Sequence, residues 1–587
     1  MKKQYDSGMI SKMFFRLLPV QILLVAIGSL NSIIDGAVAS NFIGPQAMAV
    51  TGLFVPMDRI FETINIVMLG GSQILCGQFL GRNQVDRTRN IFTVDMIVIL
   101  AVSVVGALLC LLIPGTLASF VRAEGDLVAG FCDFARGRAF GIPAFMLSSQ
   151  LTAFLQLEQQ EKRTYIGIGV MLVSNCLMDI LLVSVFGMGI FGLGLATSIS
   201  NWLYTIFLMT YYFTDKAIIR FERKGADMKD LPEIVKIGFP GAINQGCQII
   251  RGIVLNALML KYAGSDGLSA YAAINTFGGI FFAVTAGVSA ASRLLISVYT
   301  GEEDRTGLLL IVKTALYKGV TLVLASAVLI SALSVPLTMI FYRDTASAVY
   351  QMTKWGFIIF PYSMPLSCIC LVLQSFHQCF KRMKFVSGFA VVDGVVGMCG
   401  FALILAPLTG MMGIWYAQVL NGVLTVLMLF IYAAVRNRKW PVTVEKLLVM
   451  PDDFGVPEED RMDLSIHSMA EVVNTSVSIS EFCKAHGITG KRAMLASLAM
   501  EEMAGNVVEH GCNDGKTHHI DVRVVNKEDG LLLRLKDDCR PFDPRERAAI
   551  FNPEDVTKNI GVRMITGLAK DISYQNMLGL NVLTILI

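Results

Sequence analysis

Long apolar runs separated by short polar joints fill the chain as far as Val435, and beyond it the charged residues become dense. The run from Met13 to Gly44 sets the pattern, because its only charged residue after Arg16 is Asp35. Crossing a ~30 Å hydrocarbon core takes about 20 such residues, so each run of this kind predicts a membrane-spanning helix. The twelve predicted spans are 14–40, 52–78, 91–115, 132–156, 164–187, 190–213, 236–261, 269–297, 309–334, 353–376, 385–407 and 411–435.

The cationic residues gather in alternate joints. They precede the first span and follow the second, fourth, sixth, tenth and twelfth. Lys and Arg mark the cytoplasmic ends of spans, so both termini and the whole tail are predicted to be cytoplasmic. The first run is too long for the apolar core of a cleavable signal, so we expect it to remain as a span.

The spans also repeat. Residues 189–192 match 410–413 at an offset of 221, and Pro19 matches Pro240 at the same offset. The Lys-Arg pair at 162–163 matches that at 381–382 at an offset of 219. This predicts two six-span halves, about 1–215 and 230–435, in the same orientation with a cavity between them. Such an arrangement is typical of alternating-access transporters.

Composition supports this division. The chain is 54% hydrophobic and 16% charged, with a mean hydropathy of +0.60, which excludes a wholly soluble protein. The net charge of +3 gives no reason to expect a nucleic acid partner. The 12 cysteines form no CxxC pair, so we interpret them as reduced, mostly buried small side chains.

Two carboxylates within the spans are the first candidates for function. A charged side chain is costly in lipid, so Asp35 and Asp179 must face the protein interior or a water-filled cavity. Asn175 lies four residues before Asp179, which places both on one helix face where they can share an ion. The alternative is that these carboxylates only support a kink or bond a neighbouring helix.

Four further charges lie in or near the spans: Glu62 and Asp393 are cavity candidates, and Arg251 and Arg293 occupy the seventh and eighth spans. Either arginine can pair with Asp393 in a structural role. If instead the arginines line the cavity, the substrate carries negative charge.

The tail has a different pattern. A joint at 436–452 leads to residues 453–587, in which an alternating strand (MDLSIHS) precedes two helices ending at Gly487 and Gly511. A hairpin, a short helix from about Gly561 and a last strand pair follow. This order predicts a cytosolic α+β two-layer sandwich.

Three features of the tail point to a nucleotide. Glu502 and Asn506 lie four apart on one helix face, where their oxygens can meet a hydrated cation. Asp537 directly follows a strand, and the polar loop NPEDVTKNIG precedes the helix that begins near Gly561. Free N–H groups at a helix start suit phosphate.

The first 435 residues resemble the multidrug and toxic compound extrusion (MATE) family. The resemblance rests on IIDGAVASNFIGPQAMAVTGL, LGRNQVDRTRNIF, SNCLMDILLVSVFGMGIFGLGLATSISN and IGFPGAINQ. It implies a polytopic all-α antiporter of the bacterial plasma membrane, in which Na⁺ or H⁺ drives export of an organic, amphipathic compound. It also implies that Asp35, Asn175 and Asp179 take part in cation coupling.

The tail resembles the GHKL ATPase superfamily, and within it the anti-sigma-factor serine kinases, through EEMAGNVVEHG, LKDDCRPFDP and Gly-Val-Arg-Met-Ile. The resemblance implies ATP and Mg²⁺: Asn506 would hold the metal, Glu502 would activate the attacking hydroxyl or water, and Asp537 would accept from the adenine amino group. The loop that would close over the phosphates contains Asn559 and Gly561. The family pattern has glycine where Cys539 and Asn559 stand.

Three hypotheses follow. The first is a MATE-like antiporter whose tail binds ATP for regulation or signalling; ATP would not power transport, because nothing resembles a Walker A loop. The second is a membrane-anchored serine kinase for an anti-sigma-antagonist-type protein, with the transporter fold as its sensor. The third is a nucleotide-free interaction module, which Cys539 and Asn559 favour.

Overall fold

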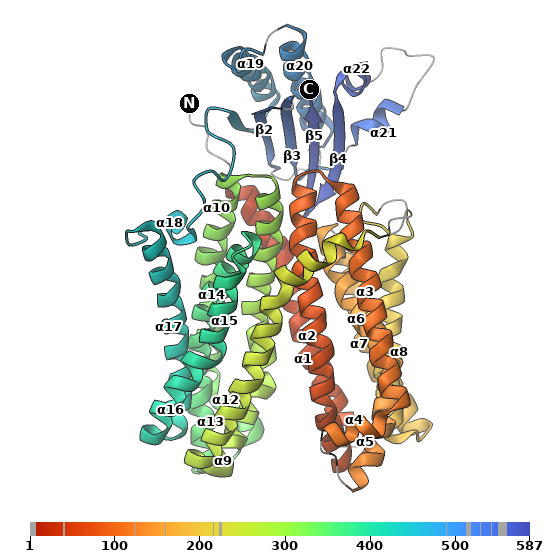
Figure 1. The fold of residues 1–587 in the computed structure, drawn as a ribbon, viewed down its shortest axis with the longest axis vertical. Helices are drawn as coiled ribbons and strands as arrows, with labels where there is room; N and C mark the ends of the chain where they lie inside the picture. The colour runs from red at the N-terminus through yellow and green to blue at the C-terminus, as the bar shows by residue number, and fades with distance from the viewer. Residues whose placement is uncertain are drawn as a thin grey trace.

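The protein is described here from a computed structural model, and Figure 1 shows a helical membrane part with an α+β domain at one end. The structure describes the whole chain except residues 1–6, 39–41, 122, 124, 159, 215–216, 222–225, 489, 512–517, 529, 542 and 550–559. The α+β domain is the part whose sequence resembles the GHKL ATPases, so we call the end of the helices next to it the ATPase-side end.

The N-terminal half contains the first five predicted spans as continuous or once-broken helices, followed by α8. Its elements are α1 (Ser7–Val38), α2 (Pro45–Gly81), α3 (Val85–Leu112), α4 (Pro114–Phe120), α5 (Asp126–Ala139), α6 (Ile142–Leu157), α7 (Glu161–Asp179), the π-helix η2 (Ile180–Val185) and α8 (Gly189–Tyr212). The first proline of the repeat, Pro19, lies inside α1.

The C-terminal half begins after the short η3 (Met228–Asp230) and repeats this arrangement. Its elements are α9 (Leu231–Gly301), α10 (Arg305–Thr314), η4 (Ala315–Gly319), α11 (Val320–Ala332), α12 (Ser334–Phe341), α13 (Ala348–Ile359), η5 (Phe360–Tyr362), α14 (Ser363–Cys379), α15 (Met383–Val391), η6 (Val392–Gly397), α16 (Met398–Thr409) and α17 (Met411–Asn437). Both halves break the corresponding helix with a π-helical turn, η2 in one and η6 in the other.

The number of membrane-spanning helices depends on whether α9 is counted as one helix or as two. Within the described residues, ten helices are long and apolar enough to cross a membrane, or eleven if the bent pair α5–α6 is one span. The 71 residues of α9 form two helices joined at a sharp kink, and each of them is long enough to cross the hydrocarbon core. It is interrupted at Gly264 (φ 64°, ψ −161°), so its two limbs correspond to the predicted seventh and eighth spans. Counting the two limbs of α9 separately and the bent pair α5–α6 as one span gives the predicted twelve spans.

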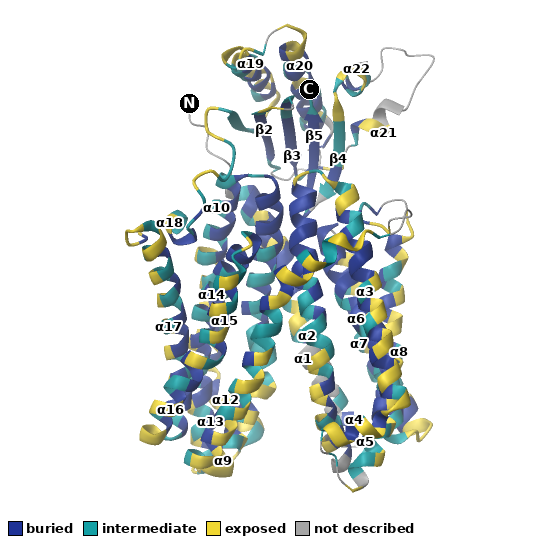
Figure 2. Ribbon diagram, viewed as in Figure 1, coloured by how far each residue is buried: buried dark blue, intermediate teal, exposed yellow. Residues whose placement is uncertain are grey.

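Glycines bring the two halves together at the ATPase-side end. A Cβ placed on Gly71 would lie 2.0 Å from the Ile234 carbonyl oxygen, and one on Gly81 would lie 2.2 Å from that of Val298. A Cβ on Gly238 would lie 1.7 Å from the Val67 carbonyl oxygen. Both ends of α9 therefore pack directly on the last turns of α2, and we call these contacts the ATPase-side seal. Figure 2 shows buried residues concentrated at this end.

Replacing Gly238 with alanine should destabilise the seal, because the new methyl group has no space beside the Val67 carbonyl. Overpacking of this kind costs about 1–3 kcal/mol, so thermal unfolding in detergent should begin at a lower temperature. Gly252→Ala on the same helix is the matched control, since nothing lies within 4 Å of its Cβ position. Equal unfolding temperatures for the two variants would show that the seal is not tightly packed.

The tail forms the predicted sandwich. A five-stranded antiparallel sheet has the order β1-β2-β3-β5-β4, with β1 (Arg461–Ile466), β2 (Ile520–Lys527), β3 (Gly530–Asp537), β4 (Asp571–Met577) and β5 (Leu580–Leu586). Its helices are α19 (Met469–Ala485), α20 (Lys491–Asn506), the π-turn η7 (Val507–Gly511), α21 (Pro544–Ala549) and α22 (Ile560–Leu568). The predicted fold class is confirmed.

The strand pattern explains this packing. Val522, Val524 and Leu533 alternate along β2 and β3 and join the buried core formed with α19, α20 and α22. The joint before the sheet is also packed: α18 (Val444–Leu448) lies within it, and Leu448 is fully buried among the membrane helices. The joint therefore holds the domain against the C-terminal half.

Candidate functional sites

The three predicted coupling residues meet in one cluster in the N-terminal half. Asn175 on α7 donates from Nδ2 to Asp35 Oδ1 on α1 at 2.8 Å and to Asp179 Oδ2 at 2.7 Å. Ser200 on α8 donates to Asn175 Oδ1 at 3.0 Å. Asn175 is 1% exposed and Asp179 is fully buried. Three helices thus converge on two carboxylates linked by one amide.

This geometry favours binding of a small cation or a proton. Two ionised carboxylates that share one donor repel each other, so a positive charge between them stabilises the cluster. Asp179 Oδ1 is buried, and none of the described residues donates a hydrogen bond to it. Together with the Asn175 and Ser200 oxygens it offers the oxygen ligands that hard cations prefer. Ser200 was not singled out from the sequence; its only signal is that it lies 221 residues before Asn421.

The C-terminal half contains a related contact. Asn421 on α17 donates to Asp393 Oδ1 at 2.9 Å, next to η6. Asp393 lies 218 residues after Asn175, and Asn421 lies 221 after Ser200, so the two contacts occupy equivalent positions of the repeat. At this position of the repeat, the N-terminal half has the amide of Asn175 and the C-terminal half has the carboxylate of Asp393.

The remaining cavity candidates lie apart from the cluster. Glu62 pairs with Arg59 on its own helix at 2.7 Å and is 41% exposed, as expected of a surface ion pair. Among the described residues no ion pair within 4.0 Å joins Asp393 to Arg251 or Arg293. The Nε atom of Arg293 is buried and finds no hydrogen-bond acceptor in the part of the chain that the structure describes.

In the tail, the structure brings Glu502 and Gly561 together. A Cβ on Gly561 would lie 2.4 Å from Glu502 Cδ, so the first turn of α22 packs on the Glu502 carboxylate. Asn506 Nδ2 donates to the Glu502 carbonyl oxygen at 2.7 Å, which turns the amide oxygen away from the helix backbone. This orientation suits a metal ligand. Asn559 lies outside the described residues.

Asp537 is held at the end of β3 by two donors. Its Oδ1 accepts from Asn581 Nδ2 at 2.6 Å and from the Cys539 backbone N–H at 3.0 Å. Burial raises the pKa of Asp537 to about 6 against these hydrogen bonds, so at neutral pH it is chiefly ionised and can accept from an amino group. Asn581, which lies on the last strand, was not identified from the sequence.

Cys539 has a local explanation. A Cβ on Gly511 would lie 3.0 Å from Cys539 Cβ, so the thiol side chain occupies space that a glycine at position 511 leaves open. Positions 511 and 539 face each other, so a side chain at 539 is accommodated by the glycine at 511. Asp537 keeps its hydrogen bonds beside it.

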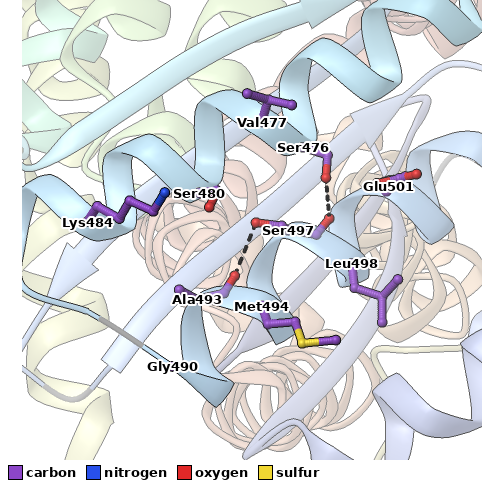
Figure 3. Close-up of a pocket in the computed structure, with 10 residues that line it drawn as sticks. All are labelled: Ser476, Val477, Ser480, Lys484, Gly490, Ala493, Met494, Ser497, Leu498 and Glu501. Carbon is purple, nitrogen blue, oxygen red and sulfur yellow. Dashed lines mark hydrogen bonds between the residues drawn. The ribbon is translucent and has the colours of Figure 1, made fainter.

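A groove of about 520 Å³ lies between α19 and α20 (Figure 3). Ser476 donates to the Ser497 carbonyl oxygen across it at 3.3 Å, and Glu501 lies at one end. Glu501 and Glu502 are successive on α20 and so point in different directions. The groove is therefore separate from the predicted nucleotide site.

These features define a multi-pass membrane transporter with two related helical halves and an attached ATPase-like domain. Residues 22–185 and 240–407 match the MatE family, which is more than half of the chain. Residues 468–587 match the family described as histidine kinase-like ATPase domain. The chain therefore belongs to the MatE family and carries a C-terminal ATPase-like domain, as the sequence resemblance predicted.

Relatives and solved structures agree. The chain is 22% identical over 428 residues to "Multidrug export protein MepA" of Staphylococcus saprophyticus, covering 72% of this chain and 93% of that protein. It is 23% identical over 363 residues to "Probable multidrug resistance protein NorM" of Photorhabdus laumondii, covering 58% and 77%.

Among solved structures, "Outward-facing conformation of a multidrug resistance MATE family transporter of the MOP superfamily" matches with a TM-score of 0.68 at 17% identity. The match covers 74% of this chain and 98% of that one. At this identity the match shows the fold.

Proposed function

We propose that this protein is a cation-coupled antiporter of the bacterial plasma membrane that exports an organic, amphipathic compound, using Na⁺ or H⁺. The observation that carries the proposal is the single amide of Asn175 joining Asp35 and Asp179. One cation or proton neutralises such a pair, and its release when the site opens to the other side couples ion flow to export. The names of the relatives, which refer to multidrug export and resistance, support an organic substrate.

The tail is proposed to bind Mg²⁺-ATP as a regulatory domain on the cytoplasmic side. The oriented amide of Asn506 fits a metal ligand, and ionised Asp537 fits an acceptor for the adenine amino group. When bound, the metal would neutralise phosphate charge. We infer that Glu502, which packs on the first turn of α22, would accept a proton from an attacking hydroxyl or water. A serine-kinase role toward an anti-sigma-antagonist-type protein stays a prediction.

Reconstituted transport tests this proposal. Full-length protein in liposomes is given a Na⁺ or a proton gradient, and the export of one cationic and one anionic amphipathic dye is followed by fluorescence. We expect one gradient to raise the initial rate for one dye about tenfold, within the usual range of coupling free energies. The preferred dye charge then decides whether the arginines of the C-terminal half attract the substrate. Rates that no gradient alters would contradict antiport.

A further inference from the structure

The sheet of the ATPase-like domain is buried on both faces. One face packs on the domain's own helices. The opposite face, which we call the outer face, presents Arg523, Arg534 and Lys536, each about 5% exposed or less. Alternation of charged and apolar residues normally marks a sheet with one face in water. Here the membrane part covers that face, and Leu578, Leu580 and Val582 join the buried cluster of the membrane helices.

The outer face holds the C-terminal half through buried ion pairs. Lys536 pairs with Glu302 at 2.5 Å and Arg523 with Asp304 at 2.6 Å, in the joint between α9 and α10. The side chains of Glu302 and Asp304 are 2% and 0% exposed. Breaking a buried pair leaves an uncompensated charge and costs several kcal/mol, so these contacts persist.

The linker adds to this attachment. Arg305, at the start of α10, pairs with Glu445 at 3.0 Å and donates to the Pro451 carbonyl oxygen at 2.8 Å. The domain is thus joined to the C-terminal half both by its linker and by its outer face.

Most described contacts with the N-terminal half are of a weaker kind, and the exception is the buried hydrogen bond from Arg534 to the Gly81 carbonyl oxygen. The Leu578 N–H donates to the Leu157 carbonyl oxygen at 3.4 Å, and Gln575 donates to Asn83 at 2.5 Å. Lys12 on α1 pairs with Asp538 at 2.5 Å, with the Lys12 side chain 50% exposed. Neutral and partly exposed contacts of this kind cost far less to break than buried ion pairs.

Arg534 contacts both halves at once. Its Nη2 donates to the Gly81 carbonyl oxygen of α2 at 3.1 Å, and its Nη1 lies 3.7 Å from Glu302 Oε1. These two partners flank the close crossing of α2 and α9, where a Cβ on Gly301 would lie 2.1 Å from the Gln78 carbonyl oxygen. The outer face therefore lies directly on the ATPase-side seal.

We propose that the outer face is a docking surface for both transporter halves that holds the ATPase-side seal closed, and that its release from the N-terminal half permits the seal to open. This inference rests on the proposed alternating-access transport, in which the ATPase-side ends must separate once in each cycle. The domain stays on the C-terminal half because the contacts there are buried ion pairs. Release occurs at the N-terminal half, where the described polar contacts are hydrogen bonds and one partly exposed ion pair.

The same geometry gives a bound nucleotide a way to control the ATPase-side seal. Asp538, the partner of Lys12, is the residue after Asp537, the proposed adenine acceptor. A nucleotide that shifts the end of β3 therefore acts directly on the ion pair to α1, and α1 also carries Asp35. By linkage, the state of the seal must in turn alter nucleotide affinity.

Cross-linking tests which half is released. Lys12→Cys with Asp538→Cys joins the domain to the N-terminal half, and Glu303→Cys with Lys527→Cys, which replaces a pair at 3.1 Å, joins it to the C-terminal half. Both pairs are treated in full-length protein with a short bismaleimide, with each single-cysteine variant as the control for native thiols. Hydrogen exchange of residues 67–81 then reports opening of the seal.

We expect the first cross-link to slow this exchange about tenfold, which is a shift of about 1.4 kcal/mol in the opening equilibrium, and the second to leave it unchanged. Equal slowing by both, or by neither, overturns the proposal. The readout needs no substrate or ion gradient. If the uncross-linked protein exports no dye under any gradient, the proposed transport fails while the exchange result still decides the docking.

A second test removes a contact between the outer face and the transporter halves instead of cross-linking it. Arg534→Ala removes the contact shared by both halves, and Lys527→Ala removes only an exposed contact with Glu303. Exchange of residues 67–81 should rise about tenfold in the first variant and remain unchanged in the second. A folded Arg534→Ala protein with unaltered exchange overturns the proposal, and if that variant does not fold, the cross-links decide.

Discussion

Replacing Asp35 with asparagine is expected to abolish gradient-driven export while leaving the fold intact. Asparagine preserves the size of the side chain and its hydrogen-bonding capacity toward Asn175, but it can neither bind a proton nor attract a cation. With one carboxylate left in the cluster of α1, α7 and α8, the repulsion that a bound cation or proton relieves is absent, so the ion loses its preference for one state. Losing this coupling removes the rise of about tenfold in the initial rate that the gradient gives to the unchanged protein.

The measurement is the initial rate of dye export from proteoliposomes with and without the gradient. Glu62→Gln is the matched control, because this carboxylate pairs with Arg59 on its own helix and lies outside the cluster. It should export at the rate of the unchanged protein. If Asp35→Asn still responds fully to the gradient, the coupling role of the cluster is wrong.

Replacing Asn506 with alanine should remove Mg²⁺-dependent ATP binding. The amide nitrogen of Asn506 is held by the Glu502 carbonyl, so its oxygen is already positioned and little reorganisation is needed for metal binding. Loss of a ligand or its orienting partner typically lowers metal affinity 10–100-fold, so we expect a fall of about that size in ATP affinity with Mg²⁺ present. Without Mg²⁺ the two proteins should bind ATP almost equally.

Titration of full-length protein with a fluorescent ATP analogue, with and without Mg²⁺, measures this difference. The control is Glu501→Ala, which changes a neighbouring acidic residue of α20 that lines the separate groove. An Asn506→Ala protein with unaltered Mg²⁺-dependent affinity would support the view that the tail is an interaction module without nucleotide.

Local sequence patterns predicted much of this fold. Alternation along 520–527 and 530–537 gave the hairpin with its turn, and the matching offsets of Pro19 and Pro240 gave the two halves. Asn175 and Asp179 could be placed on one face because helical spacing is fixed by geometry. The two limbs of α9 were predicted as the seventh and eighth spans, because the sequence around Gly264 resembles an ordinary joint between two spans.

Contacts between distant segments could not be predicted in this way. Arg523, Arg534 and Lys536 alternate with apolar residues, and such a pattern normally indicates a face in water. Their burial depends on Glu302 and Asp304, more than 200 residues earlier in the chain. Ser200 and Asn581 were missed for a related reason, since a single polar residue in a helix or strand carries no local signal of its partner.

The burial of charge between the sheet and the α9–α10 joint also limits how freely the two parts of the chain can be exchanged. A transporter and an ATPase joined by a loose tether can each be exchanged for a homologue without loss. Here Glu302 and Asp304 match Lys536 and Arg523 residue by residue, so substitutions on one side require compensation on the other. Chimeras that exchange either part alone should therefore fold with unpaired charges at the junction.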